Sequence, residues 1–204
     1  MEKSIQHPLD FAGIHAVIVV APSGGGKGTV IEKFLKDHSD KFFLSKSDTT
    51  KADTGKGEFY EFISKEEFER RIILGRYIEY EEVNGDFYGT PQSQFDMAQK
   101  ENRIVLLDID VKGATRLKRI LKSSGIKFLF LFIDSGDLPE SKHEVSVYEK
   151  RIRERGRGES EEKIAKRIAR IPGELSDGRF EADVIVQNVG EKQDLLSYFD
   201  GCRF

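Results

Sequence analysis

The feature that most restricts the fold of this chain is a glycine-rich segment between an apolar run and a helical pattern. Residues 15–21, HAVIVVA, predict a buried strand. Residues 22–29, PSGGGKGT, follow directly, and apolar residues at helical spacing begin at Val30. Glycines let backbone N–H groups curve around an anion, and a helix that starts there directs its positive dipole end at the same point. This arrangement predicts a phosphate-binding loop after a buried strand.

The loop departs in two places from the usual pattern G-x-x-x-x-G-K-[ST]. Ala21 stands at the first glycine position, and Gly28 stands where a serine or threonine would follow the lysine. Lys27 is still placed to reach terminal phosphates, and Thr29 to help hold Mg²⁺, directly or through water. An ordinary glycine-rich turn is the alternative, but the strand–loop–helix context favours a phosphate loop.

Apolar runs and helical patterns alternate along the 204 residues. Strands that are apolar on both faces and separated by helices indicate a parallel sheet covered on both sides. The predicted fold class is therefore α/β, a P-loop NTPase-type parallel sheet flanked by helices. Strands are predicted at 15–21, 42–47, 76–83, 86–90, 103–110, 126–134 and 182–188, and helices at 29–38, 65–74, 91–102, 113–123 and 192–199.

Two sections interrupt this rhythm. Residues 45–90 contain short strands of alternating polarity, which predict an inserted small lobe, and the charged section 138–172 predicts a second, helical insertion. We expect a single domain over residues 1–204. Its core is expected at about 1–44, 91–137 and 173–204.

Charge and cysteine content exclude several classes of protein. The formal net charge is −3, so no general positive field would recruit nucleic acid or an anionic membrane. A single cysteine, Cys202, cannot form an internal disulfide. The apolar run at 128–133 is too short to cross a bilayer, and the first residues lack a signal-peptide pattern. We expect a cytoplasmic protein, monomeric or homodimeric, without nucleic-acid or membrane partners.

A series of further motifs resembles those of the guanylate kinase family over nearly the whole chain. The loop APSGGGKGT matches the family's G-P-S-G-x-G-K-[SG]-T except at its first position. Each remaining match is weak alone, but their order and spacing make chance a poor explanation. They are SKSDTTK (45–51), YEFIS (60–64), GRYIE (75–79), YGT (88–90), LDIDVKG (107–113), KRIRERGRGESEEKIAKRI (150–168) and VIVQN (184–188).

The resemblance implies transfer of the γ-phosphoryl group of ATP to GMP or dGMP, giving ADP and GDP, with Mg²⁺. It implies that the lobe at 45–90 binds GMP. It also implies that the section at 138–172 is a helical lid, which carries arginines for the transferring phosphoryl group. By the resemblance, the catalytic residues are Lys27, Arg155 and Arg167, and Thr29 and Asp108 hold the metal. ATP-binding residues are Ser23, Gly24, Gly25, Gly26, Lys27, Gly28, Thr29, Arg151 and Asn188. GMP-binding residues are Ser47, Lys51, Glu58, Tyr60, Glu79, Tyr88, Thr90, Asp108 and Asp110.

The residue types suit these roles. A buried carboxylate at Glu79 can accept hydrogen bonds from N1–H and the exocyclic amine of guanine, which adenine does not offer in that arrangement. Phosphoryl transfer needs positioning and charge neutralisation more than a general base, which suits Arg155 and Arg167. Spacing alone would place these arginines on an ordinary solvated helix, so only the resemblance assigns their role.

The acceptor side departs from the family pattern. The family's T-T-R-x-x-R-x-G-E carries two arginines, whereas TTKADTGKGE here has Lys51 and Thr54 at those positions. Lysine cannot form the bidentate fork that arginine makes with phosphate. Lys56 could take that place, and Glu58 could replace the family glutamate. We therefore expect weaker acceptor binding or another acceptor; the long section at 134–148 has no explanation.

Two other functions stay open at this point. The first is a related P-loop kinase with another phosphorylated acceptor, such as a ribose bisphosphate. Glu79 and Ser47 argue against it, because a sugar phosphate has no base edge to read. The second is a catalytically silent guanylate-kinase-like protein-interaction module, against which Lys27, Arg155 and Arg167 argue because such modules usually lose these residues.

Overall fold

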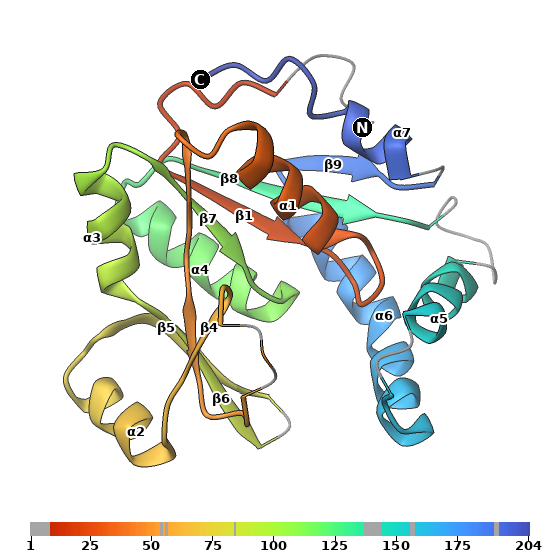
Figure 1. Cartoon of the computed structure of the whole chain (residues 1–204), viewed down its shortest axis with the longest axis horizontal. Coiled ribbons are helices and arrows are strands. Elements are labelled where there is room, and N and C mark those ends of the chain that lie inside the picture. Colours follow the sequence, from red (N-terminus) through yellow and green to blue (C-terminus); the bar gives the residue numbers. More distant parts are fainter. Residues whose placement is uncertain are drawn as a thin grey trace.

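A five-stranded parallel sheet forms the centre of the molecule, with strand order β2-β7-β1-β8-β9 (Figure 1). The computed structural model describes residues 9–53, 55, 57–83, 85–136, 144–155, 158–189 and 192–204. The predicted parallel α/β fold is confirmed. The strands of this sheet are β1 (Ala16–Val20), β2 (Phe42–Leu44), β7 (Ile104–Asp108), β8 (Phe128–Asp134) and β9 (Val184–Gln187).

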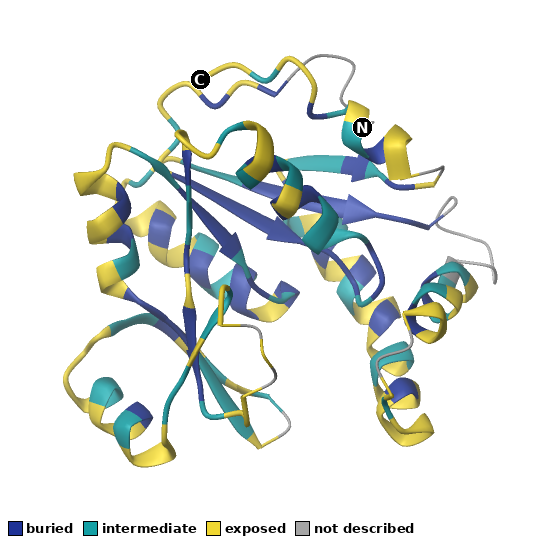
Figure 2. Ribbon diagram, viewed as in Figure 1, coloured by how far each residue is buried: buried dark blue, intermediate teal, exposed yellow. Residues whose placement is uncertain are grey.

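Helices cover both faces of this sheet. Those that matter for packing are α1 (Lys27–Asp37), α3 (Gln92–Lys100), α4 (Val111–Ser123), α6 (Glu161–Glu181) and α7 (Lys192–Ser197). Buried side chains of α3, α4 and α6 form one core with one face of the sheet, and those of α1 and α7 form a second core with the other face. The central strands are buried along their length (Figure 2).

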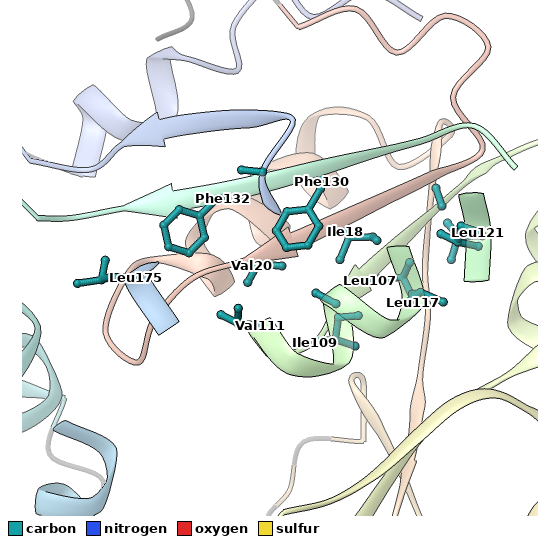
Figure 3. Close-up of a cluster of buried hydrophobic side chains, with 14 of the residues drawn as sticks. Ile18, Val20, Leu107, Ile109, Val111, Leu117, Leu121, Phe130, Phe132 and Leu175 are labelled. Atoms are coloured by element: carbon teal, nitrogen blue, oxygen red, sulfur yellow. The ribbon is translucent and has the colours of Figure 1, made fainter. Parts of the chain in front are cut away.

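Side chains of β1 alternate between the two cores, as the pleat requires. Ile18 and Val20 point into the core beneath α4 and α6, where they meet Phe130 and Phe132 of β8 (Figure 3). Val19 points to the opposite core. Because both faces are buried, each strand is a continuous apolar run, which is why the sequence pattern identified these strands.

The second sheet belongs to the predicted lobe. Its strand order is β4-β3-β6-β5, with β3 (Ser47–Thr49), β4 (Tyr60–Phe62), β5 (Tyr77–Val83) and β6 (Asp86–Pro91). Helix α2 (Lys65–Ile73) begins after Ser64, whose hydroxyl accepts a hydrogen bond from the Glu67 amide. β5 and β6, which correspond to the strands predicted at 76–83 and 86–90, pair antiparallel as a hairpin.

The prediction of one strand over residues 42–47 is wrong. β2 ends at Leu44 in the central sheet, and β3 begins at Ser47 in the lobe sheet. Between them, the Lys46 amide donates to the Gln94 side chain rather than to a strand neighbour. An apolar-to-polar run cannot indicate that the chain changes sheets in its middle.

The charged section forms α5 (Glu144–Glu154) and the first part of α6. These two helices extend beyond the central sheet, apart from the lobe (Figure 1). α6 continues past Pro172 to Glu181, so the lid boundary expected at residue 172 falls inside a helix. The long section at 134–148 lies partly outside the described residues. No helix in the described part of the chain is long and apolar enough to span a membrane.

The packing of α6 on β8 generates a stability prediction. Gly178 is buried, and a Cβ there would clash with the Phe132 ring. We expect Gly178→Ala to lower the free energy of unfolding by about 1–3 kcal/mol through overpacking. On the same helix, Gly173 has open space around it, and Gly173→Ala should instead raise that free energy by about 0.5–1 kcal/mol. Urea unfolding of both variants tests this; a stable Gly178→Ala protein would contradict the packing.

Candidate active site

The glycine-rich loop joins β1 to α1 and depends on glycine at three successive positions. Gly24 and Gly26 have φ angles of 88° and 101°, which L side chains rarely adopt. A Cβ at Gly25 would lie 2.8 Å from the Ala21 Cβ. The alanine at the loop's first position is therefore accommodated because Gly25 has no side chain. Beneath the loop, the Asn188 side-chain amide donates to the Gly25 carbonyl at 2.8 Å.

Lys27, in the first turn of α1, reaches the end of the neighbouring strand β7. Its Nζ lies 2.5 Å from Asp108 Oδ1 and donates to the Ile109 carbonyl at 3.0 Å. Asp108 Oδ1 is buried and accepts no hydrogen bond among the described residues. Its ion pair with Lys27 therefore offsets the cost of burying this charge. The phosphate-loop lysine and this carboxylate thus meet at the carboxyl edge of the sheet.

A cavity of about 650 Å³ lies over the loop. Arg167 of α6 closes one side: its Nε donates to Ser23 Oγ at 2.8 Å, and its NH1 pairs with Glu159. The predicted residues that line this cavity are Ser23, Gly24, Gly25, Gly26, Lys27, Gly28, Thr29, Tyr60, Asp108, Asp110, Arg155 and Arg167.

A second cavity of about 200 Å³ reaches into the lobe. Its predicted lining residues are Lys27, Ser47, Tyr60, Glu79, Tyr88, Asp108 and Asp110. Lys27, Tyr60, Asp108 and Asp110 line both cavities, so the two spaces meet at these four side chains. Residues far apart in the sequence therefore form one two-part site.

Glu79 is the buried carboxylate of the second cavity. Its Oε1 accepts a hydrogen bond of 2.7 Å from Thr90 Oγ1, and Thr90 is itself completely buried. Burial raises the pKa of Glu79 from an ordinary value of 4.5 to about 7, against the opposing effects of the Thr90 hydrogen bond and the Arg116 charge. A buried carboxylate can accept several hydrogen bonds, and the structure gives Glu79 the one from Thr90. It is therefore suited to a ligand that donates hydrogen bonds.

Asp110 lies beyond the end of β7 and caps α4. Its Oδ1 accepts from the Gly113 amide at 2.8 Å, while its Oδ2 lies 3.8 Å from the Arg170 guanidinium. Arg170 also lies 3.2 Å from Glu174, and both residues line the first cavity. Arg170 and Glu174 were not predicted from the sequence, although they follow Arg167 at helical spacings of three and seven and so share its face.

Five predicted residues do not line either cavity, and one of them is Thr90, which is completely buried and hydrogen-bonded to Glu79. Arg151 and Asn188 lie under the loop, where Arg151 donates to Ser135 Oγ at 2.6 Å and to the Asn188 carbonyl at 3.0 Å. Lys51 and Glu58 are exposed. Thr54 and Lys56 fall outside the described residues.

The site fits a metal ion that is shared with phosphates rather than enclosed by protein. In the described part of the chain, no group of three or more His, Cys, Asp or Glu side chains could hold a metal. Asp108, whose Oδ1 is paired with Lys27 in this structure, and Thr29 are the residues that could supply hard oxygen ligands. Mg²⁺ is commonly bound in this way, by one or two protein ligands, phosphates and water.

Comparison with known proteins agrees with this geometry. The family model for guanylate kinase matches residues 14–193. The chain is 37% identical to guanylate kinase of Porphyromonas gingivalis over 90% of its length and 96% of that protein. It is 32% identical to guanylate kinase of Sus scrofa, covering 80% of this chain and 78% of that one. With rice guanylate kinase 1 it shares 36% identity over 80% of this chain, which spans 40% of the rice protein.

Among solved structures, guanylate kinase from Anaplasma phagocytophilum has the same fold. The TM-score is 0.61 at 22% identity, covering 91% of this chain and 82% of that one. The fold and the two-part site define a P-loop phosphotransferase of the nucleoside monophosphate kinase type. The chain belongs to the guanylate kinase family.

The raised pKa of Glu79 generates a prediction about stability. Because the folded protein holds this proton up to about pH 7 and the unfolded chain releases it near 4.5, stability falls as pH rises through that window. The Glu79→Gln variant has no such proton to release, so it avoids this loss, which is at most ~3 kcal/mol in the free energy of unfolding. We expect the advantage of Glu79→Gln in urea unfolding to be larger at pH 8.5 than at pH 5. Glu82→Gln, on the exposed side of the same strand, is the control; an advantage independent of pH would contradict the burial argument.

Proposed function

We propose that this chain is an ATP:GMP phosphotransferase that makes GDP and ADP. The observation that carries the proposal is the junction of two cavities at Lys27, Tyr60, Asp108 and Asp110. One cavity has a phosphate loop, and the other has a buried carboxylate that suits guanine. A donor phosphate and an acceptor nucleotide bound in these cavities would meet at the junction.

The proposed guanine site is built on Glu79. Its carboxylate accepts hydrogen bonds from N1–H and the exocyclic amine of the base, and Ser47, which lines the same cavity, adds a polar contact. Thr90 fixes one carboxylate oxygen through its 2.7 Å hydrogen bond. Adenine would leave the buried carboxylate without donors, a penalty of about 1–3 kcal/mol for each unsatisfied group. Tyr60 and Tyr88 would donate hydroxyl groups to the phosphate of GMP.

In the donor site, the loop amides and Lys27 bind the phosphates of ATP. Mg²⁺, held by Asp108 and Thr29 with water, supplies charge neutralisation when bound. Arg155 and Arg167 stabilise the transferring phosphoryl group, whose charge is spread over its oxygens. Arg151 and Asn188 support the loop from below, through contacts with Ser135 and Gly25.

The lobe at 45–90 and the lid at 138–172 would close over the two nucleotides. Closure excludes water, which would otherwise accept the phosphoryl group. This arrangement favours catalysis over a silent interaction module, because Lys27, Arg155 and Arg167 all line the cavity. It favours GMP over a ribose bisphosphate, because the second cavity has a buried base-reading carboxylate.

A coupled ADP-release assay with Mg-ATP tests the proposal. We expect turnover with GMP and dGMP and rates at least a hundredfold lower with AMP, CMP, UMP or a ribose bisphosphate, since the buried carboxylate rejects bases without matching donors. Omission of Mg²⁺ should abolish turnover. Turnover on another acceptor would mean that the site has a different specificity. GMP binding without turnover would support the interaction module instead.

The pKa of Glu79 predicts how base binding depends on pH. A protonated Glu79 cannot accept both hydrogen bonds from guanine, so affinity should fall as pH decreases below about 7. Guanosine is the better probe, because it lacks a phosphate group that titrates near pH 6. Calorimetry between pH 5.5 and 8.5 should show this loss in the wild type. In Glu79→Gln, binding should be weak and independent of pH; an unchanged wild-type affinity would contradict the role of Glu79.

A further inference from the structure

Arg170 lies in the first cavity, beside one of the four residues at which the two cavities meet. Its guanidinium NH2 is 3.8 Å from Asp110, which lines both cavities, and the Arg170 side chain lines the donor cavity beside Arg155 and Arg167. Arg167, one helical turn before it, contacts Ser23 in the phosphate loop. Arg167 is thus directed to the loop, whereas Arg170 is directed to the junction.

The acceptor side needs such a cation. Lys51 stands in place of an arginine of the family pattern, is exposed, and lines neither cavity among the described residues. Tyr60 and Tyr88 can each donate one hydroxyl hydrogen bond, but neither carries a positive charge. A nucleoside monophosphate bound in the second cavity would bring close to two negative charges to the junction. Among the described residues, Lys27 and Arg170 are the cations that the structure pairs with the junction carboxylates Asp108 and Asp110.

Arg170 is also held in place by the fold. Ile171, the next residue, is completely buried against the central sheet, so this turn of α6 is fixed to the core. Glu174, one turn further, lies 3.2 Å from Arg170 Nε and is largely buried. Burial raises the pKa of the Glu174 carboxyl, while the Arg170 charge and the Ser23 backbone amide oppose this. Together, Asp110 and Glu174 orient the guanidinium before any nucleotide binds.

We propose that Arg170 binds the phosphate group of GMP and so replaces the arginine contact that the loop at 51–58 lacks. Its planar guanidinium provides the bidentate geometry that Lys51 cannot provide. In the complex, NH2 exchanges Asp110 for one phosphate oxygen and NH1 donates to a second, while Glu174 keeps Nε in place. This inference rests on the proposed function, because it names a ligand of the proposed acceptor.

Comparison of GMP with guanosine isolates the phosphate contact. Calorimetry should show that Arg170→Ala weakens GMP binding roughly tenfold to a hundredfold, the effect of losing a charge-assisted hydrogen bond, and leaves guanosine binding unchanged. Mg-ATP affinity should also stay unchanged, and the KM for GMP should rise. Arg170→Lys should recover only part of the GMP affinity, because lysine keeps the positive charge but cannot form a bidentate contact. Lys166→Ala, an exposed residue of the same helix that pairs with Glu162, is the matched control.

Three results would overturn the inference. They are unchanged GMP affinity in both Arg170 variants, an equal loss for GMP and guanosine, and a loss confined to Mg-ATP. An equal loss would mean that Arg170 acts only by positioning Asp110. If Arg170→Ala does not fold, as judged by its thermal transition, Arg170→Lys and guanosine still decide the question. Failure of the proposed function is distinguishable, because the wild-type chain itself would then not phosphorylate GMP.

Discussion

The ion pair between Lys27 and Asp108 joins the parts on which the site depends. It exists because β1 and β7 are parallel neighbours, with Asp108 beside Val19 in the register. The first strand then leads into the glycine loop and α1, and the second ends in Asp108 at the same edge of the sheet. Two apolar strands thus place a cation and a carboxylate 2.5 Å apart, although 80 residues separate them in the sequence. The donor site is therefore a consequence of strand order.

The site also contains groups that reduce stability. Burial raises the pKa of Glu79 to about 7, and among the described residues the buried Asp108 Oδ1 is compensated by its ion pair with Lys27 alone. Gly24 and Gly26 adopt backbone angles that are entropically costly to fix. These features lie at the junction or beside it, while the two apolar cores lie between the central sheet and the helices that cover its faces. The packed strands thus stabilise the molecule, and the ends of the strands carry the function.

The sequence predicted the central strands because burial on both faces leaves a continuous apolar run, and it predicted the loop because few residues other than glycine allow such a turn. The change of sheet between Leu44 and Ser47 was not predictable, since it depends on the partners of each strand. Arg170 and Glu174 were missed for a related reason. On a charged helix, local spacing shows which residues share a face but not that the face turns toward a cavity.

Charge balance in the donor cavity explains why a divalent cation suits the reaction. Among the described residues, the cationic side chains that line it are Lys27, Arg155, Arg167 and Arg170, and the carboxylates are Glu32, Asp108, Asp110 and Glu174. The lining is therefore balanced before any phosphate arrives. A triphosphate and a monophosphate add several negative charges that the protein alone does not neutralise. Phosphates must then exchange for carboxylates as partners of the arginines, and Mg²⁺ beside Asp108 would carry the remaining charge. Preformed ion pairs that keep the Arg167 and Arg170 guanidinium groups oriented reduce the reorganisation that this exchange requires.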